Sequence, residues 1–173
     1  VNLGYAVAVV GKSYWHAQRA LNALPIVWDV GDKGKISNAD IAEFVASGLT
    51  EEGVPVARDD GDVKAALATA AKVIEAEYRV PFLSHAAMEP MNCTVRFTAD
   101  GLEIWAPTQN AEAILRSAAK SADMDPTKIV VHLTYSGGGF GRRGGAADRD
   151  YVEQAVRITK AVGRPVKLVW SRE

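Results

Sequence analysis

The chain contains a single cysteine, Cys93, among its 173 residues. One cysteine excludes an internal disulfide framework and any metal site built from cysteines alone. The sequence also lacks an apolar run near the ~18 residues that a membrane-spanning helix needs. It has no basic excess, because 20 Lys and Arg stand against 21 Asp and Glu, and the net charge of −1 argues against general binding to nucleic acid. What remains is an ordinary globular balance, with 48% hydrophobic and 24% charged residues.

Both ends of the sequence run directly into apolar, strand-like segments. The chain starts with Val1 rather than Met and enters a predicted strand at 5–10, and little follows a predicted last strand at 166–170. We therefore expect the chain to be a piece of a larger protein, with some functional residues outside it.

Hydrophobic periodicity predicts a mixture of strands and helices along the whole chain. Ser13 is a suitable N-cap for a helix over 13–24 that ends at Pro25. With strands at 5–10 and 26–30, this helix would form a small β-α-β unit. The spacing predicts further helices at 38–46, 60–72, 111–121 and 148–162. It also predicts strands at 74–80, 93–98, 102–106, 128–135 and 166–170, the second and third of these forming a hairpin. The fold class is α+β, or mixed α/β.

A glycine-rich stretch, SGGGFGRRGG at 136–145, lies between a predicted strand and a predicted helix. Six of its ten residues are glycine, so the backbone can adopt positive φ angles and a ligand can approach main-chain N–H groups closely. Such groups near a helix start bind anions or oxygen-rich cofactors, and Arg142 and Arg143 strengthen this interpretation. The alternative interpretation is a flexible connector, which usually needs fewer glycines.

Residues 139–144 also match G-x-G-x-x-G, the pattern of dinucleotide-binding Rossmann folds. The predicted helix starts several residues after Gly144, and the first acidic residue after the next strand is Glu173, at the end of the sequence. This spacing argues against a Rossmann fold. A Rossmann-type nucleotide-dependent oxidoreductase and a stand-alone module that binds an anionic ligand without chemistry are the two alternatives to a cofactor loop.

Gln109 lies between a predicted strand and a predicted helix. Its side-chain amide offers two donors and one acceptor to a ligand. In the alternative interpretation Thr108 or Asn110 caps the helix and Gln109 is merely solvated.

Two other positions have simpler interpretations. His85 and Glu89 are four residues apart and could share a metal on a helix, but Pro81 and Pro90 disfavour a helix there, so we expect a hydrogen-bonded His–Glu pair. Cys93, at the start of a strand, is expected to be a core residue.

Three segments taken together resemble one family. They are SHAAMEPMNCT at 84–94, WAPTQN at 105–110 and GGGFGRR at 137–143, and the ending at 163–173 is similar as well. They resemble the large, molybdenum-binding subunit of the xanthine dehydrogenase/aldehyde oxidase family. The arginine pair is similar to the branch that contains the isoquinoline 1-oxidoreductase beta subunit. By this resemblance, residues 1–30 are the tail of a hammerhead-like unit, and residues 31–173 are the first part of the molybdopterin-binding domain.

The resemblance implies a pyranopterin molybdenum cofactor, in this branch the molybdopterin cytosine dinucleotide. It implies oxidation of an N-heteroaromatic ring or an aldehyde, with oxygen derived from water. The side-chain amide of Gln109 would donate to an oxo group of the cofactor. The main chain of five residues would line the cofactor, with the phenyl ring packing beside it: Gly138, Gly139, Phe140, Gly141 and Arg142. No residue of this chain would ligate the metal.

The sequence departs from the family pattern in two respects. Xanthine-type members carry Gly-Lys-Glu where this chain has Arg142, Arg143 and Gly144, which argues against a purine substrate. The family's catalytic glutamate has no match here, so this base is expected C-terminal to residue 173. The 2Fe-2S clusters would belong to a small iron–sulfur partner subunit. The sequence does not decide between the bacterial cytoplasm and the periplasm.

Two expectations follow for this chain on its own. Without the catalytic base we expect no hydroxylase activity. Without the cofactor we expect the loop at 137–145 to be poorly ordered or displaced, with Arg142 and Arg143 pointing into solvent, whereas the loop should be ordered in the holoenzyme.

Overall fold

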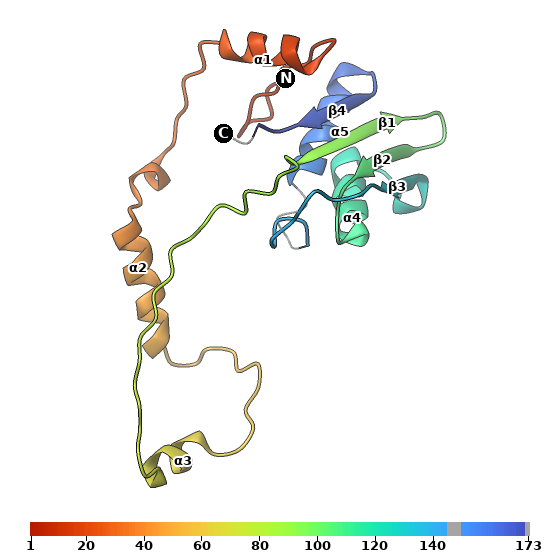
Figure 1. Cartoon of the computed structure of the whole chain (residues 1–173). Helices are drawn as coiled ribbons and strands as arrows, with labels where there is room; N and C mark the ends of the chain where they lie inside the picture. Colours follow the sequence, from red (N-terminus) through yellow and green to blue (C-terminus); the bar gives the residue numbers. More distant parts are fainter. Residues whose placement is uncertain (145–149, 172–173) are drawn as a thin grey trace. The chain divides into compact units, whose positions relative to one another are not determined.

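The computed structural model describes residues 1–144 and 150–171. They fall into two units: Val1–Leu24 together with Phe82–Glu173, and Pro25–Pro81. The first unit is built on a four-stranded sheet of β1 (Asn92–Phe97), β2 (Leu102–Ala106), β3 (Ile129–Leu133) and β4 (Val166–Val169) (Figure 1). The strand order is β3-β2-β1-β4, with β2 and β3 parallel and the other two pairs antiparallel. This mixed sheet confirms the α+β prediction and differs from the parallel sheet of a Rossmann fold.

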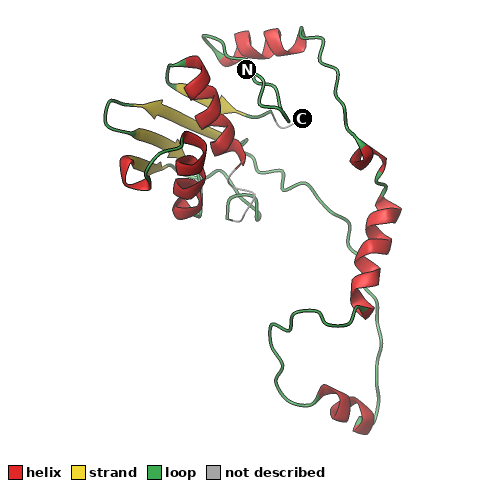
Figure 2. Cartoon of the chain, turned by 180° about the vertical axis from the view of Figure 1, so that it is seen from behind, coloured by secondary structure: helices red, strands yellow, loops and turns green. Residues whose placement is uncertain are grey.

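Two helices, α4 (Ala111–Ala122) and α5 (Asp150–Val162), pack on one face of this sheet (Figure 2). Alternate residues of the β1–β2 hairpin point toward the helices and are buried. The helices contribute their apolar faces, so that one core contains Cys93, Val95, Ile104, Ile114, Ala118, Val152 and Val156. The structure confirms the predicted hairpin, both helices and the strands at 128–135 and 166–170. These elements could be predicted because their apolar residues recur with the period of a strand or of a helix.

Two residues explain how local chemistry sets these elements. The side chain of Asn110 caps α4 by accepting a hydrogen bond from the N–H of Ala113 at 3.0 Å. Gly101 forms the hairpin turn, where a Cβ atom would lie 1.9 Å from the carbonyl oxygen of Lys128. Only glycine therefore allows the turn to approach the short 3-10 segment η3 (Pro126–Lys128), which precedes β3.

The predicted β-α-β unit at the N-terminus is only partly correct. The helix forms as α1 (Tyr14–Asn22), and Ser13 caps it as expected. The predicted strands at 5–10 and 26–30 are wrong: among the described residues, the first has only an isolated bridge between Asn2 and Val7, and the second has none. The N-terminal backbone instead bonds to itself, with Ala8 donating to Val1 and Leu3 donating to Ala6.

The second unit, Pro25–Pro81, contains α2 (Asn38–Ser47), α3 (Val63–Thr69) and the 3-10 turns η1 (Asp32–Lys35) and η2 (Gly48–Thr50). Ser37 and Asp40 form a reciprocal capping box at the start of α2. The predicted helix at 60–72 is correct only over α3, and the predicted strand at 74–80 is wrong. Its alternating side chains are exposed, and an alternating sequence does not form a ladder without a neighbouring strand.

Within the described residues, no helix is both long and apolar enough to cross a membrane. The division into a hammerhead-like tail at 1–30 and a molybdopterin-binding part at 31–173 stays a prediction.

Candidate functional site

The three segments singled out in the sequence converge at one edge of the sheet. Strands β2 and β3 are parallel, so the chain leaves both of them at the same edge, into residues 107–110 and into the glycine loop. Strand β1 is antiparallel to β2, and therefore the segment that precedes β1, residues 84–91, arrives at that edge as well. The sheet topology thus brings together residues that are about 20 to 50 positions apart in the sequence, as carboxyl ends of parallel strands often do at binding sites.

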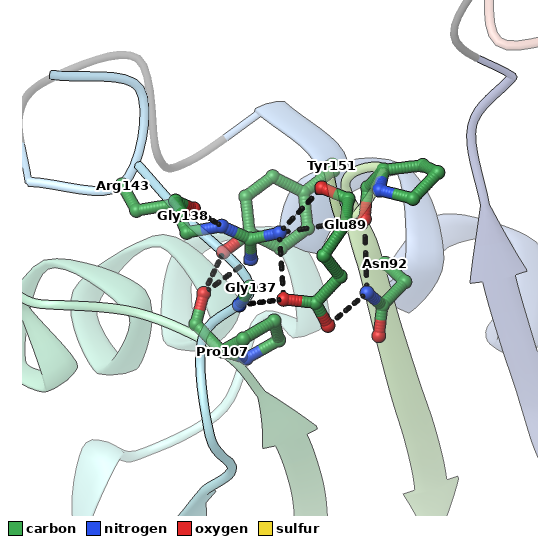
Figure 3. A network of polar contacts seen from close by, with 8 residues as sticks. Glu89, Asn92, Pro107, Gly137, Gly138, Arg143 and Tyr151 are labelled. Carbon is green, nitrogen blue, oxygen red and sulfur yellow. Dashed lines mark hydrogen bonds and ion pairs between the residues drawn. The ribbon is translucent and has the colours of Figure 1, made fainter. Parts of the chain in front are cut away.

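Arg143 is the centre of this convergence and is fully buried (Figure 3). Its Nε donates to the carbonyl of Gly138 at 2.8 Å, its Nη1 to that of Pro107 at 2.7 Å, and its Nη2 to that of Glu89 at 3.0 Å. One guanidinium thereby bonds to all three segments. The sequence alone did not indicate this role, because an arginine in a glycine loop is more readily interpreted as an anion ligand.

The Glu89 carboxylate is the ionic partner of Arg143. Its Oε2 lies 3.1 Å from Nη2 of Arg143 and accepts a hydrogen bond from the N–H of Gly137 at 2.7 Å, while Oε1 accepts from Nδ2 of Asn92 at 2.8 Å. Burial raises the pKa of Glu89, but the Gly137 N–H, the Asn92 amide and the charges of Arg143 and Lys167 outweigh it and leave the pKa below its usual value. The carboxylate therefore stays charged beside the arginine.

This network replaces the expected His85–Glu89 pair, which is wrong because Glu89 bonds instead to Arg143, Gly137 and Asn92. The ring of His85 lies against the loop, 3.6 Å from where a Cβ atom on Gly141 would be. Among the described residues, no group of three His, Cys, Asp or Glu side chains is placed to hold a metal.

The glycine loop has the backbone conformation that its sequence predicts. Gly138 and Gly141 have φ angles of +100° and +95°, and Phe140 has a φ of +52° although it carries a side chain. A bulky residue in this region is strained, and such strain is concentrated at functional sites. The Phe140 ring is largely exposed. At Gly137 a Cβ atom would lie only 2.5 Å from Cβ of Glu89, so glycine is required there for close approach.

Gln109 lies directly against this loop. Its backbone N–H donates to the carbonyl of Arg143 at 2.8 Å, and its Oε1 would be 3.2 Å from a Cβ atom on Gly139. Asn110 caps α4, as the alternative interpretation held, and Thr108 accepts from the N–H of Asn110 at 2.9 Å. In the part of the chain that the structure describes, the side-chain amide of Gln109 has no hydrogen-bond partner.

Arg142 and Arg143 do not point into solvent, so that expectation is wrong. Arg142 donates from Nη2 to both carboxylate oxygens of Asp150 at 2.9 Å and lies over the Trp170 ring, 5.3 Å from its centroid. The carbonyl oxygens around Arg143 replace the water that its charge loses on burial. Residue 145 lies outside the described residues, and so do 148 and 149, the predicted start of the last helix.

Cys93 is a buried core residue, as predicted. Burial raises the pKa of its thiol to about 12, so the thiol is neutral at physiological pH.

The chain belongs to the molybdopterin cofactor-binding domain family, whose model matches residues 49–173. It is 35% identical to the membrane-bound aldehyde dehydrogenase [pyrroloquinoline-quinone] of Gluconacetobacter polyoxogenes, over 96% of this chain and 21% of that protein. It is 28% identical to the isoquinoline 1-oxidoreductase subunit beta of Brevundimonas diminuta, over 100% of this chain and 23% of that subunit. These matches confirm the resemblance to the molybdenum-binding subunits, and the chain spans less than a quarter of the length of these two relatives.

The solved structure of quinoline 2-oxidoreductase from Pseudomonas putida 86 has a similar fold. It superposes with a TM-score of 0.52 at 21% identity and covers 64% of this chain and 14% of that one.

Proposed function

We propose that the loop at 137–144 and Gln109 bind the molybdopterin cofactor within the large subunit of a molybdenum hydroxylase. The observation that carries this proposal is a set of unused donors at one place. Among the described residues, the backbone N–H groups of Gly138, Gly139, Phe140 and Gly141 have no hydrogen-bond acceptor, and the Gln109 amide lies beside them. Such a set fits an oxygen-rich, anionic group. The matching family model supports the same assignment.

Each residue contributes a distinct interaction. The loop N–H groups donate to the cofactor, and the absence of side chains at Gly138 and Gly139 lets it approach the backbone. The exposed Phe140 ring would pack beside it, and the side-chain amide of Gln109 would donate a hydrogen bond to an oxygen of the bound cofactor. When bound, the cofactor supplies two-electron redox chemistry to the site. The general base is supplied from outside this chain.

The names of the relatives support a proposal for the substrate class. The substrate is an aldehyde or an N-heteroaromatic ring, the two classes that appear in the relatives' names. Arg143 is buried, and therefore it is not available to hold a substrate. The cofactor takes the cytosine dinucleotide form, and a small subunit with 2Fe-2S clusters accepts the electrons. One relative has pyrroloquinoline quinone in its name, so the cofactor itself has to be measured.

The test uses the full-length protein produced in a bacterial host that makes molybdopterin. The molybdenum content is measured by mass spectrometry, and any quinone is extracted and quantified. Oxidation of aldehydes and of quinolines is assayed with an artificial electron acceptor. We expect molybdenum and no quinone. Gln109→Ala should lower kcat about a hundredfold at unchanged molybdenum content, because a preorganised donor contributes ~3 kcal/mol to the transition state.

Gln18→Ala is the matched control and should have wild-type kinetics, because Gln18 is a half-buried residue of α1 whose side-chain amide donates to Asn22 of the same helix. Quinone without molybdenum would disprove the proposed cofactor. Wild-type kinetics in a molybdenum-loaded Gln109→Ala variant would remove Gln109 from the site.

A further inference from the structure

From Gly137 to Gly139, every carbonyl group of the loop backbone is hydrogen-bonded, whereas of the three N–H groups only that of Gly137 is. Three consecutive carbonyls are bonded within the protein. That of Gly137 accepts from the N–H of Glu89 at 3.1 Å, that of Gly138 from Nε of Arg143 at 2.8 Å, and that of Gly139 from the N–H of Arg142 at 2.9 Å. The loop is therefore anchored on one side of its backbone.

This anchoring determines where the N–H groups point. In a planar trans peptide the carbonyl of one residue and the N–H of the next point in opposite directions. The carbonyls of Gly137 and Gly138 face Glu89 and the buried guanidinium of Arg143, so the N–H groups of the next residues, Gly138 and Gly139, face away from these partners. These are two of the four loop N–H groups without an acceptor among the described residues. The carbonyl of Gly139 instead closes a turn within the loop with the N–H of Arg142.

We propose that Arg143 and Glu89 are a positioning pair, which orients the N–H groups of Gly138 and Gly139 before the cofactor binds. Glu89 acts at Gly137, whose N–H it accepts and whose carbonyl it bonds through its own N–H. Arg143 acts at Gly138 and also holds Gln109, which donates its N–H to the Arg143 carbonyl. Neither side chain touches the cofactor. This inference rests on the proposed cofactor site.

The chemistry of the guanidinium distinguishes this role from simple charge neutralisation. Arg143 uses Nε, Nη1 and Nη2 for the carbonyls of three separate segments. A lysine has a single nitrogen on a flexible stem and cannot reach all three in one plane. Arg143→Lys keeps the positive charge beside Glu89 but loses the planar group with three donor nitrogens. This conservative variant should therefore fail to position the loop.

The experiment compares wild-type full-length protein with Arg143→Lys and with Arg116→Lys, an exposed arginine on α4 as the matched control. Hydrogen exchange is followed in cofactor-free protein from a host that cannot make molybdopterin. In the wild type and the control, the Gly137 and Gln109 amides should be protected, and the amides of Gly138, Gly139 and Phe140 should exchange rapidly. In Arg143→Lys, the Gly137 and Gln109 amides should exchange at least tenfold faster, while β1 and β2 keep their protection.

The second readout is cofactor loading in a molybdopterin-producing host. Arg143→Lys should retain severalfold less molybdenum than the control, and its loaded fraction should keep the wild-type KM because Arg143 does not touch the substrate. Glu89→Gln, which leaves an amide oxygen for the Gly137 N–H, should fall between Arg143→Lys and the wild type. It also provides the test if Arg143→Lys does not fold.

The outcomes separate the two proposals. Wild-type exchange and wild-type molybdenum content in Arg143→Lys would overturn the positioning role and leave the proposed function intact. Faster exchange spread equally over β1, β2 and the loop would overturn it too, because it would show a general loss of stability. No molybdenum in the wild type would overturn the proposed function and, with it, this inference.

Discussion

Gly137→Ala is the smallest change that tests how closely the loop must approach Glu89. A Cβ atom at residue 137 would lie 2.5 Å from Cβ of Glu89 and 3.4 Å from its backbone nitrogen. The φ angle of Gly137 is not in the left-handed region, so the substitution adds no dihedral strain. The new methyl group can be accommodated only if the loop moves away from Glu89.

The magnitude follows from two opposing effects. Forcing an extra carbon into a close contact costs ~1–3 kcal/mol. Replacing glycine by alanine at a permitted φ stabilises by ~0.4–1 kcal/mol, through the lower entropy of the unfolded chain. The net cost is about 1–2 kcal/mol, and it weakens the hydrogen bond from the Gly137 N–H to Glu89 by about this amount. Local opening should become about 5- to 30-fold more frequent.

Hydrogen exchange of residue 137 and of Gln109, in cofactor-free full-length protein, measures this opening. Gly144→Ala is the matched control, because its Cβ would lie 3.5 Å from Oε1 of Gln109, an ordinary contact, and its φ is also permitted. We expect faster exchange for Gly137→Ala and little change for Gly144→Ala. Equal exchange rates in the two variants would show that the close approach of the loop to Glu89 is not required.

Two further predictions concern single groups. Because the folded pKa of Glu89 lies below its usual value of 4.5, its contribution to stability is present above about pH 4.5 and is lost as pH falls through the folded pKa. The urea midpoint of the wild type should therefore fall more steeply on acidification than that of Glu89→Gln, and parallel curves would contradict the assignment. Cys93, buried and with a thiol pKa of about 12, should react with a maleimide only in denaturant. Rapid labelling of the native protein would show that this core opens.

The elements that the sequence predicted correctly are those that have a packing partner in the sheet or the core, even where that partner is distant in the sequence, as for β4 beside β1. In the hairpin strands β1 and β2 and in the helices α4 and α5, apolar and polar residues alternate in the sequence with the period of a strand or of a helix. The strands predicted at 5–10, 26–30 and 74–80 were wrong for a common reason. Alternation of apolar and polar residues describes a face, whereas a strand also needs a neighbour for its backbone groups, and this neighbour cannot be read from a local window.

The candidate site was predictable in its parts but not in its connections. The glycine pattern indicated positive φ angles near 138–141, and the structure has them at Gly138, Phe140 and Gly141. The contacts of Arg143 with Pro107 and Glu89 span 36 and 54 residues, and no periodicity encodes separations of that length. Glu89 and Asn92 lie within one of the three family-like segments, which was the available signal for a role beyond the expected histidine pair.

The two adjacent arginines show why residue type alone is a weak guide to the site. In the sequence both are cations inside an anion-binding loop, and both would be expected to contact the ligand. In the structure, Arg142 bonds to Asp150 at the start of α5, and Arg143 is surrounded by carbonyl oxygens. Both guanidinium groups therefore bond to groups of the protein itself. The ability of the loop to hold an anionic cofactor then depends on its backbone N–H groups, and Arg143 contributes by holding the carbonyl of Gly138 on the opposite side of that backbone.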